Sequence, residues 1–196
     1  MPLNGNDIRI QKNLIRENLK QLRNCLTIAE KQRLDTKIAN RFLNLWQYRE
    51  SGLILAYVSN SIEVDTKFII EQALIQGKRV AVPKCVVGTR KLEYYLIDSL
   101  EALEKGSFGI LEPCESKCEK LLNCSGGLVI VPALSFDKNG FRLGFGKGYY
   151  DRFLSNSELK TVGICYDCCL MDDLPKGKYD RNVNMVITES KILYLA

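Results

Sequence analysis

The 196-residue sequence contains no histidine. A Ser-His-Asp triad, a Cys-His nucleophile pair and a His-ligated metal site are therefore excluded. Proton transfer has to use Asp, Glu, Lys, Tyr, Cys or water. The sequence also lacks an apolar run long enough to cross a bilayer, and its first six residues lack the apolar core of a secretory signal. We expect a cytoplasmic protein that does not contact membranes.

The sequence has little excess charge of either sign. It has 28 Lys and Arg and 23 Asp and Glu, a net charge of +5. Residues 1–50 hold 10 basic and 5 acidic side chains, and residues 51–196 hold 18 of each, so the excess lies in the first quarter. So small and local an excess is not typical of a nucleic-acid-binding protein. With 46% hydrophobic residues, the length predicts one domain spanning residues 1–196.

Cysteine is plentiful by contrast, and its eight copies need an interpretation. In a cytoplasmic protein they are expected to be reduced thiols. A thiolate zinc site is the alternative, but the spacing is not a paired CxxC motif. The cysteines that would form it are Cys114, Cys118, Cys124, Cys165, Cys168 and Cys169.

Two helices are predicted before any strand. Residues 8–26 form an amphipathic pattern, and residues 29–48 form a second one that begins with a capping box of Thr27 and Glu30. The apolar positions of the first helix are Ile8, Ile15, Leu19, Leu22 and Leu26, and those of the second are Leu34, Ile38, Phe42 and Leu45.

The remaining chain alternates short apolar runs with helical stretches. Helices are predicted at 65–76 and 148–154, and strands at 53–58, 79–82 (ended by Pro83), 92–97, 128–131, 161–165 and 184–188. Nearly continuous apolar strands interleaved with helices are typical of parallel sheets covered on both faces. The predicted class is therefore α/β: a single-domain, mainly parallel Rossmann-like sheet flanked by helices and preceded by the two N-terminal helices.

Residues 142–151, Arg-Leu-Gly-Phe-Gly-Lys-Gly-Tyr-Tyr-Asp, carry the densest chemistry. They follow a predicted buried strand and enter a helix, where open α/β sheets bind ligands. The three alternating glycines allow backbone N–H groups to converge on an anion. The spacing matches neither a Walker A loop nor a GxGxxG turn. A glycine-rich hairpin with solvated charges is the alternative, but so many glycines and basic residues together favour phosphate binding.

This segment resembles the nucleotide and folate loop of the 5-formyltetrahydrofolate cyclo-ligase family, also called 5,10-methenyltetrahydrofolate synthetase. Further similar segments, in the same order, are 12–16, 26–30, 57–66, 109–113 and 174–175 with Asp180, so the resemblance spans nearly the whole chain. Tyr179 stands where the family usually has His, and Cys169 where Gln is common.

The resemblance implies ATP- and Mg²⁺-dependent cyclisation of 5-formyltetrahydrofolate to 5,10-methenyltetrahydrofolate, with release of ADP and phosphate, through a phosphorylated formyl (imidate) intermediate. The partners would be these small molecules, not nucleic acid, and the chain would be a monomer or weak homodimer. The implied catalytic residues are Arg142 and Lys147, and the implied metal ligands are Asp151 and Asp180. ATP would contact Lys12, Arg16, Arg142, Leu143, Gly144, Phe145, Gly146, Lys147, Gly148, Tyr149 and Tyr150. The folate would contact Val58, Glu63, Phe145, Gly146, Lys147, Gly148 and Tyr149.

Other interpretations remain at this stage. The basic stripe on the first helix is typical of a solvated face; the resemblance exempts Lys12 and Arg16, and Arg9, Lys20 and Arg23 are expected in solvent. Glu63 is otherwise an acid in the first turn of a helix capped by Asp65 and Thr66. For the whole chain, the alternatives are a catalytically silent relative that serves as a binding or regulatory module, for example for RNA, and an ATP-independent enzyme related to sugar-phosphate isomerases or CoA-transferases.

Overall fold

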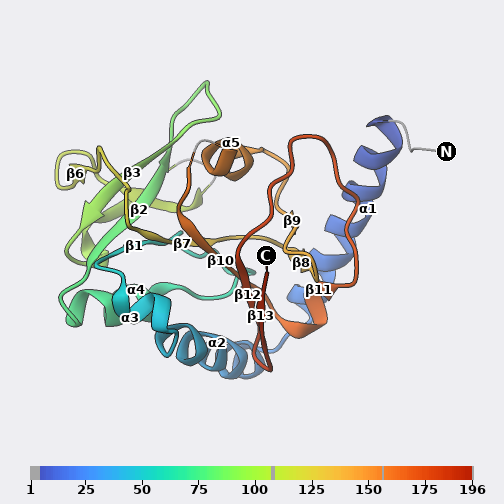
Figure 1. Cartoon of the computed structure of the whole chain (residues 1–196), viewed down its shortest axis with the longest axis horizontal. Coiled ribbons are helices and arrows are strands. Elements are labelled where there is room, and N and C mark those ends of the chain that lie inside the picture. The colour runs from blue at the N-terminus through green and yellow to red at the C-terminus, as the bar shows by residue number, and fades with distance from the viewer. Residues whose placement is uncertain (1–4, 107–108, 156, 196) are drawn as a thin grey trace.

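A single eight-stranded sheet with helices on both of its faces organises the chain (Figure 1). The computed structural model describes residues 5–106, 109–155 and 157–195. The strand order is β13-β12-β10-β7-β1-β2-β3-β6. In chain order these strands are β1 (Leu53–Leu55), β2 (Arg79–Cys85), β3 (Leu92–Ile97), β6 (Glu119–Lys120), β7 (Leu128–Val131), β10 (Lys160–Ile164), β12 (Met185–Ile187) and β13 (Ile192–Tyr194).

Five adjacent strands of this sheet, β12, β10, β7, β1 and β2, are parallel, and the outer strands β13, β3 and β6 pair antiparallel with their neighbours. All four residues of β7 are buried, as expected for a strand covered on both faces. The predicted α/β class and mainly parallel sheet are confirmed. Two small sheets complete the fold: β11 (Leu170–Met171) with β8 (Ser135–Asp137) and β9 (Arg142–Leu143), and β4 (Leu103–Lys105) with β5 (Leu111–Pro113).

Helices α2 (Ile28–Leu43), α3 (Trp46–Glu50) and α4 (Lys67–Ile75) lie on one side of the sheet, and α5 (Tyr149–Ser155) lies on the other (Figure 1). The predicted capping box is confirmed, because the Thr27 side chain accepts the Glu30 N–H and the Glu30 carboxylate accepts the Thr27 N–H. The single helix predicted over 29–48 is wrong. Asn44 ends α2 by donating its side-chain amide to the Asn40 carbonyl at 2.8 Å, and α3 is a separate turn.

Proline ends fewer strands than expected. Residues 79–82 were predicted to stop before Pro83, but β2 continues to Cys85. The pairing of β1 with β2 ends at Leu55 and Ala81, so Pro83 lies where β2 has a neighbour on one side only, and its missing N–H leaves no ladder bond broken. The strand predicted over 53–58 is also shorter than expected, because β1 ends at Leu55, where its pairing with β2 ends. Helix α1 begins three residues before the predicted start at residue 8, and the remaining predicted elements differ from the observed ones by two residues or fewer at each end.

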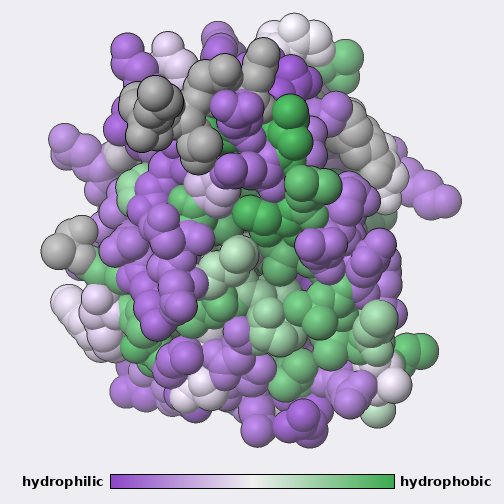
Figure 2. Space-filling model, turned by 90° about the vertical axis from the view of Figure 1, so that its right-hand side faces the viewer, coloured by the Kyte–Doolittle hydropathy of each residue, from purple (hydrophilic) through white to green (hydrophobic). Residues whose placement is uncertain are grey.

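Helix α1 (Gly5–Asn24) lies at the right of Figure 1, and its side of the molecule faces the viewer in Figure 2, where polar residues surround an apolar area. Its predicted apolar face is only partly right, because Leu19 is buried but Leu22 is 39% exposed. Arg23, expected in solvent, is 3% exposed, and this prediction is wrong. Polar contacts therefore contribute much of the attachment of α1 to the rest of the fold.

Within the described ranges, no helix combines the length and the apolar character needed to cross a membrane.

Candidate active site

The glycine loop, residues 144–148, connects β9 to α5. Gly146 and Gly148 have φ values of 93° and 73°, in the left-handed region that favours glycine. A Cβ atom on Gly146 would lie 3.3 Å from Cζ of Arg16, so the loop backbone packs closely against a guanidinium from α1. The alternating glycines are thus needed both for the turn and for this close approach.

Lys12 and Arg16 bring α1 to the glycine loop. They are four residues apart and lie on the same face of the helix. Nε of Arg16 donates to the carbonyl of Gly144 at 2.8 Å, and Nζ of Lys12 pairs with Oδ2 of Asp180 at 2.5 Å. The same Asp180 oxygen accepts the N–H of Gly177 at 2.6 Å. Segments from both ends of the sequence therefore meet at this loop.

Arg142 lies beneath the loop and is 9% exposed. Its Nη2 is 2.7 Å from Oδ1 of Asp151, and the guanidinium lies over the Tyr150 ring, 5.7 Å from its centroid. Burial lowers the pKa of Arg142, and Asp151, Tyr150 and Asp180 oppose that change. Nε of Arg142 is buried and has no hydrogen-bond partner in the described part of the chain. A desolvated cation with an unused donor is suited to binding an anion.

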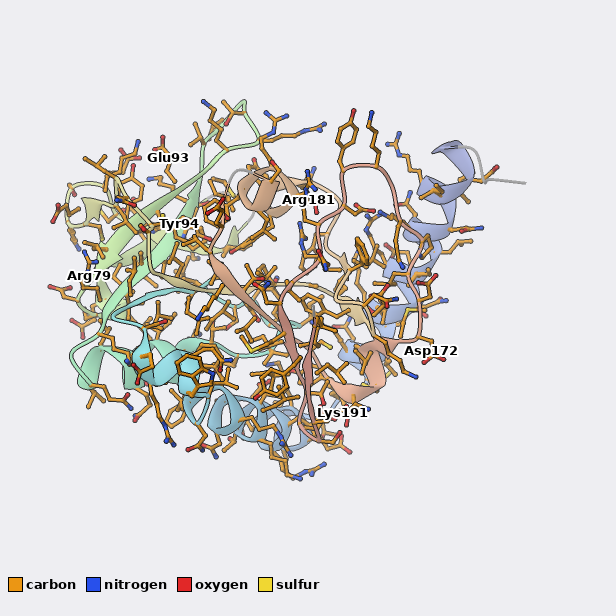
Figure 3. All side chains as sticks on the ribbon, viewed as in Figure 1. Arg79, Glu93, Tyr94, Asp172, Arg181 and Lys191 are labelled. Atoms are coloured by element: carbon orange, nitrogen blue, oxygen red, sulfur yellow. The ribbon has the colours of Figure 1, made fainter. Side chains whose placement is uncertain are left out.

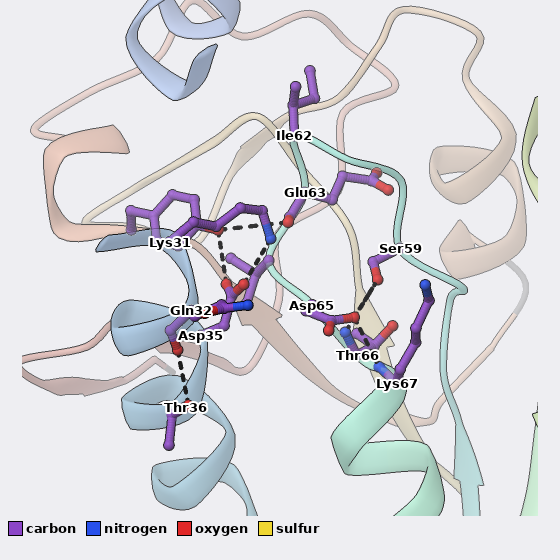
Figure 4. A network of polar contacts seen from close by, with 12 residues as sticks. Lys31, Gln32, Asp35, Thr36, Ser59, Ile62, Glu63, Asp65, Thr66 and Lys67 are labelled. Atoms are coloured by element: carbon purple, nitrogen blue, oxygen red, sulfur yellow. Dashed lines mark hydrogen bonds and ion pairs between the residues drawn. The ribbon is translucent and has the colours of Figure 1, made fainter. Parts of the chain in front are cut away.

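Glu63 lies in the loop between β1 and α4 and is 5% exposed. Its Oε2 accepts the N–H of Asn60 at 2.9 Å, and Figure 4 shows its carboxylate pointing away from the Lys31–Asp35 ion pair. Burial raises the pKa of Glu63, and the Asn60 hydrogen bond opposes this. Because α4 begins at Lys67, Glu63 is not a first-turn acid of that helix, and that interpretation is wrong.

Tyrosine side chains connect Glu63 to the glycine loop. Tyr57 and Tyr150 both have a pKa raised first by burial and then, among other causes, by the charge of Glu63. The Tyr57 hydroxyl donates to the carbonyl of Val64 at 2.9 Å, and the buried hydroxyls of Tyr150 and Tyr94 lie next to each other. An interior polar region therefore runs from Glu63 to the start of α5.

The remaining predicted site residues differ widely in their exposure to solvent. The side chain of Leu143 is 1% exposed in the core and its carbonyl accepts the N–H of Leu134, so it offers a ligand little. Val58 is also buried, while Phe145 is 41% exposed and Lys147 is exposed on the loop. Tyr179, at the position where the family usually has His, is 76% exposed.

Two residues near Tyr149 were not predicted from the sequence to belong to the site. Glu112, which is absent from the predicted site, is 5% exposed, and its Oε1 accepts the N–H of Cys85 at 3.3 Å. Burial and then Glu112 raise the pKa of the Cys85 thiol to about 11, while a hydrogen bond from Tyr149 opposes them. The two residues are 27 positions apart in different strands, and no local pattern relates them.

The structure gives two carboxylates at the loop but no complete metal cage. Asp151 is paired with Arg142 and Asp180 with Lys12. No described group of three or more Cys, Asp or Glu residues could hold a metal ion, which also leaves the cysteine zinc alternative without support. One or two carboxylates beside a loop of this kind would fit Mg²⁺ that arrives with phosphates, since Mg²⁺ keeps several waters and is seldom caged by protein alone.

Comparison with known proteins shows the family to which the chain belongs. The profile of the 5-formyltetrahydrofolate cyclo-ligase family matches residues 8–189. The chain belongs to this family. The cyclo-ligase of Haemophilus influenzae is 31% identical over 172 residues, covering 85% of this chain and 91% of that protein. The mouse cyclo-ligase is 30% identical over 186 residues, covering 89% and 92%. The expected enzyme class, a ligase, is confirmed at the level of the family.

Solved structures of cyclo-ligase relatives share the fold. The 5,10-methenyltetrahydrofolate synthetase of Aquifex aeolicus superposes with a TM-score of 0.83 at 31% identity, covering 94% of this chain and 92% of that one. The synthetase of Mycoplasma pneumoniae gives a TM-score of 0.73 at 25% identity, covering 91% and 98%. The family resemblance expected from the sequence is therefore confirmed by the profile, by relatives and by structure.

Proposed function

We propose that this chain catalyses the ATP-dependent cyclisation of 5-formyltetrahydrofolate to 5,10-methenyltetrahydrofolate, with release of ADP and phosphate. The observation that carries the proposal is the convergence of Lys12, Arg16 and Arg142 on a glycine loop that also has Asp151 at its helical end. The polar region that leads from this loop to the buried Glu63 supports a site for a second substrate beside the first.

Phosphate binding follows from the loop geometry. The amides of the glycine loop, including Gly144, Gly146 and Gly148, would cradle the ATP phosphates, with Lys12, Arg16, Arg142 and Lys147 neutralising their charge. Asp151 and Asp180, which now pair with Arg142 and Lys12, would instead bind the Mg²⁺ carried by the nucleotide. Mg²⁺, when bound, supplies positive charge to the phosphoryl oxygens.

Folate binding follows from Glu63. Its buried carboxylate, held at one oxygen by the Asn60 N–H, is suited to accept hydrogen bonds from the N–H donors of a pterin ring. Tyr149, Tyr150 and Phe145 would line the space between that ring and the phosphates, with Val58 beside Glu63.

The proposed chemistry needs no histidine. The formyl oxygen attacks the γ-phosphorus, the bond from that phosphorus to ADP breaks, and a phosphorylated imidate forms. The N10 amine then adds to the activated carbon and loses its proton, and phosphate departs with the former formyl oxygen. Positioning and charge neutralisation supply most of the catalysis of phosphoryl transfer, and Arg142 and Lys147 are the side chains proposed for this role.

The direct test is to incubate the protein with 5-formyltetrahydrofolate and Mg-ATP and to follow methenyl absorbance in the near ultraviolet. ATP-dependent product is expected, and Lys147→Ala should lower kcat by about 10²-fold or more. Lys138→Ala is the matched control, since Lys138 is exposed and pairs with Asp172 away from the loop. Absence of any ATP-dependent signal would contradict the proposal; retention on RNA at physiological salt would then favour the silent relative.

A further inference from the structure

A cavity of about 710 Å³ lies beside α5 and outside the proposed nucleotide and pterin contacts. Its walls come from the turn between β2 and β3, from residues 123–126 before β7, and from α5 with the segment that follows it. In Figure 3, Glu93 and Tyr94 mark the β3 side of this region. The cavity is within the usual size range of small-molecule sites.

Positive charge predominates in the cavity lining. Arg90, Lys91 and Arg152 face two acids, Glu93 and Glu158. Glu93 is already paired with Lys120 at 2.7 Å, while the three basic residues form no ion pair with any described residue.

A second cavity nearby, of about 560 Å³, gives a useful contrast. Its lysines, Lys84 and Lys120, are paired with Glu115 and Glu93 at 3.0 and 2.7 Å. Its charges are thus neutralised within the protein. Only the first of these two cavities offers uncompensated positive charge to a ligand.

The cavity adjoins the glycine loop along one face of α5. Tyr149, at the start of this helix, lies three and four residues before Arg152 and Phe153, which line the cavity, so the three side chains share a face. Arg90, in the turn that follows β2, lines the same cavity as Arg152 and Phe153. A ligand that passes Tyr149 therefore enters a cationic cavity about one helical turn further on.

We infer that this cavity binds the carboxylates of the glutamate tail of the folate, and that Arg90 and Arg152 are its main contacts. The inference rests on the proposed function. 5-Formyltetrahydrofolate ends in a glutamate with two carboxylates, and each glutamate added through the γ-carboxyl contributes one more. Phe153 and Leu92 supply apolar walls for the chain between the carboxylates, and arginine recognises a carboxylate through paired N–H donors.

The test compares three substrates that differ only in the tail: the 5-formyltetrahydropteroate form without glutamate, the monoglutamate and the triglutamate. For wild-type protein we expect KM to fall along this series. In the double variant Arg90→Gln/Arg152→Gln, the KM for the triglutamate should rise about three- to tenfold. Its kcat and its KM for the pteroate form should stay the same. The loss should shrink as salt is raised.

The matched control is Arg79→Gln/Arg33→Gln, which removes two exposed arginines outside the cavity; Arg79 lies at the opposite end of β2 (Figure 3). An equal rise in KM for the pteroate form, an undiminished triglutamate advantage in the double variant, or a rise in the KM for ATP would overturn the inference. If no folate is turned over, the proposed function fails instead. Calorimetric binding of the triglutamate and pteroate forms to both proteins then still tests the cavity.

Discussion

Arg16 and Arg23 lie seven residues apart on α1, two turns along the same face, and yet their surroundings differ sharply. Arg23 is 3% exposed and donates to three carbonyls: Nη1 to Ile62, and Nη2 to Ala133 and Leu134, at 2.7–3.0 Å. Arg16 is half-buried and donates to the single carbonyl of Gly144, with Nη1 on Asn13. One end of the helix is a buried attachment point, and the other keeps donor capacity at an open loop.

Burial and the number of available hydrogen-bond acceptors, and not residue type, therefore separate a structural arginine from a ligand-binding one. Arg23 joins α1 to the loop that carries Glu63 and to the segment after β7, because both of its terminal nitrogens donate to backbone carbonyls there. Nη2 of Arg16 has no hydrogen-bond partner in the part of the chain that the structure describes, and it lies beside Gly146. Four predictions test this division, from the largest expected free-energy effect to the smallest.

Arg23→Met should lower the free energy of unfolding by about 3 kcal/mol, because three buried carbonyls lose their donors at roughly 1 kcal/mol each. Urea unfolding measures this. Arg9→Met on the same helix is the control, since Arg9 is exposed, and should change stability by less than about 0.5 kcal/mol. A loss no greater than the control's would mean that Arg23 is not an attachment point.

Arg16→Met should raise the KM for ATP about tenfold or more, the value of a hydrogen bond to a charged phosphate, while the KM for folate changes little. Stability should fall by no more than about 1 kcal/mol. Steady-state kinetics at fixed saturating co-substrate separates the two KM values. Lys20→Met is the control, because among the described residues Lys20 forms an ion pair with the neighbouring Glu17 alone. A larger rise in the KM for folate would refute the division.

Glu63→Gln should raise the KM for folate about tenfold through loss of a charged acceptor, with the KM for ATP unchanged. It should also stabilise the fold at neutral pH. Burial raises the folded-state pKa of Glu63, so its ionised form is disfavoured, and wild-type stability should increase as pH falls through that pKa toward the unfolded value of about 4.3.

The pH dependence of unfolding, measured for wild type and for Glu63→Gln, checks this sign. The variant should lack the rise at lower pH that comes from Glu63. Glu71→Gln, an exposed position on α4, is the control and should leave both KM values as they are. Equal pH profiles for wild type and Glu63→Gln would contradict the prediction.

Local patterns in the sequence predicted the fold class, the capping box and the glycine loop, because each depends on residues near one another in the chain. They could not predict the burial of Arg23 or of Glu112. Whether a basic side chain on a helix is solvated depends on the carbonyls that face it, and those of Ala133 and Leu134 are more than a hundred positions away. The family resemblance named Lys12 and Arg16, but their partners Asp180 and Gly144 appear only in three dimensions.

The turn between α1 and α2 gives the smallest and most selective test. Thr27→Ala removes the capping box and should cost about 1 kcal/mol of unfolding free energy. Thr36→Ala is the matched control, because Thr36 is exposed within α2 and bonds only the Gln32 carbonyl, and alanine favours helix there. If Arg23 fixes the position of α1, the weakened cap should leave the KM for ATP unchanged. A raised KM for ATP in Thr27→Ala would mean that the cap, and not Arg23, aligns Lys12 and Arg16 with the glycine loop.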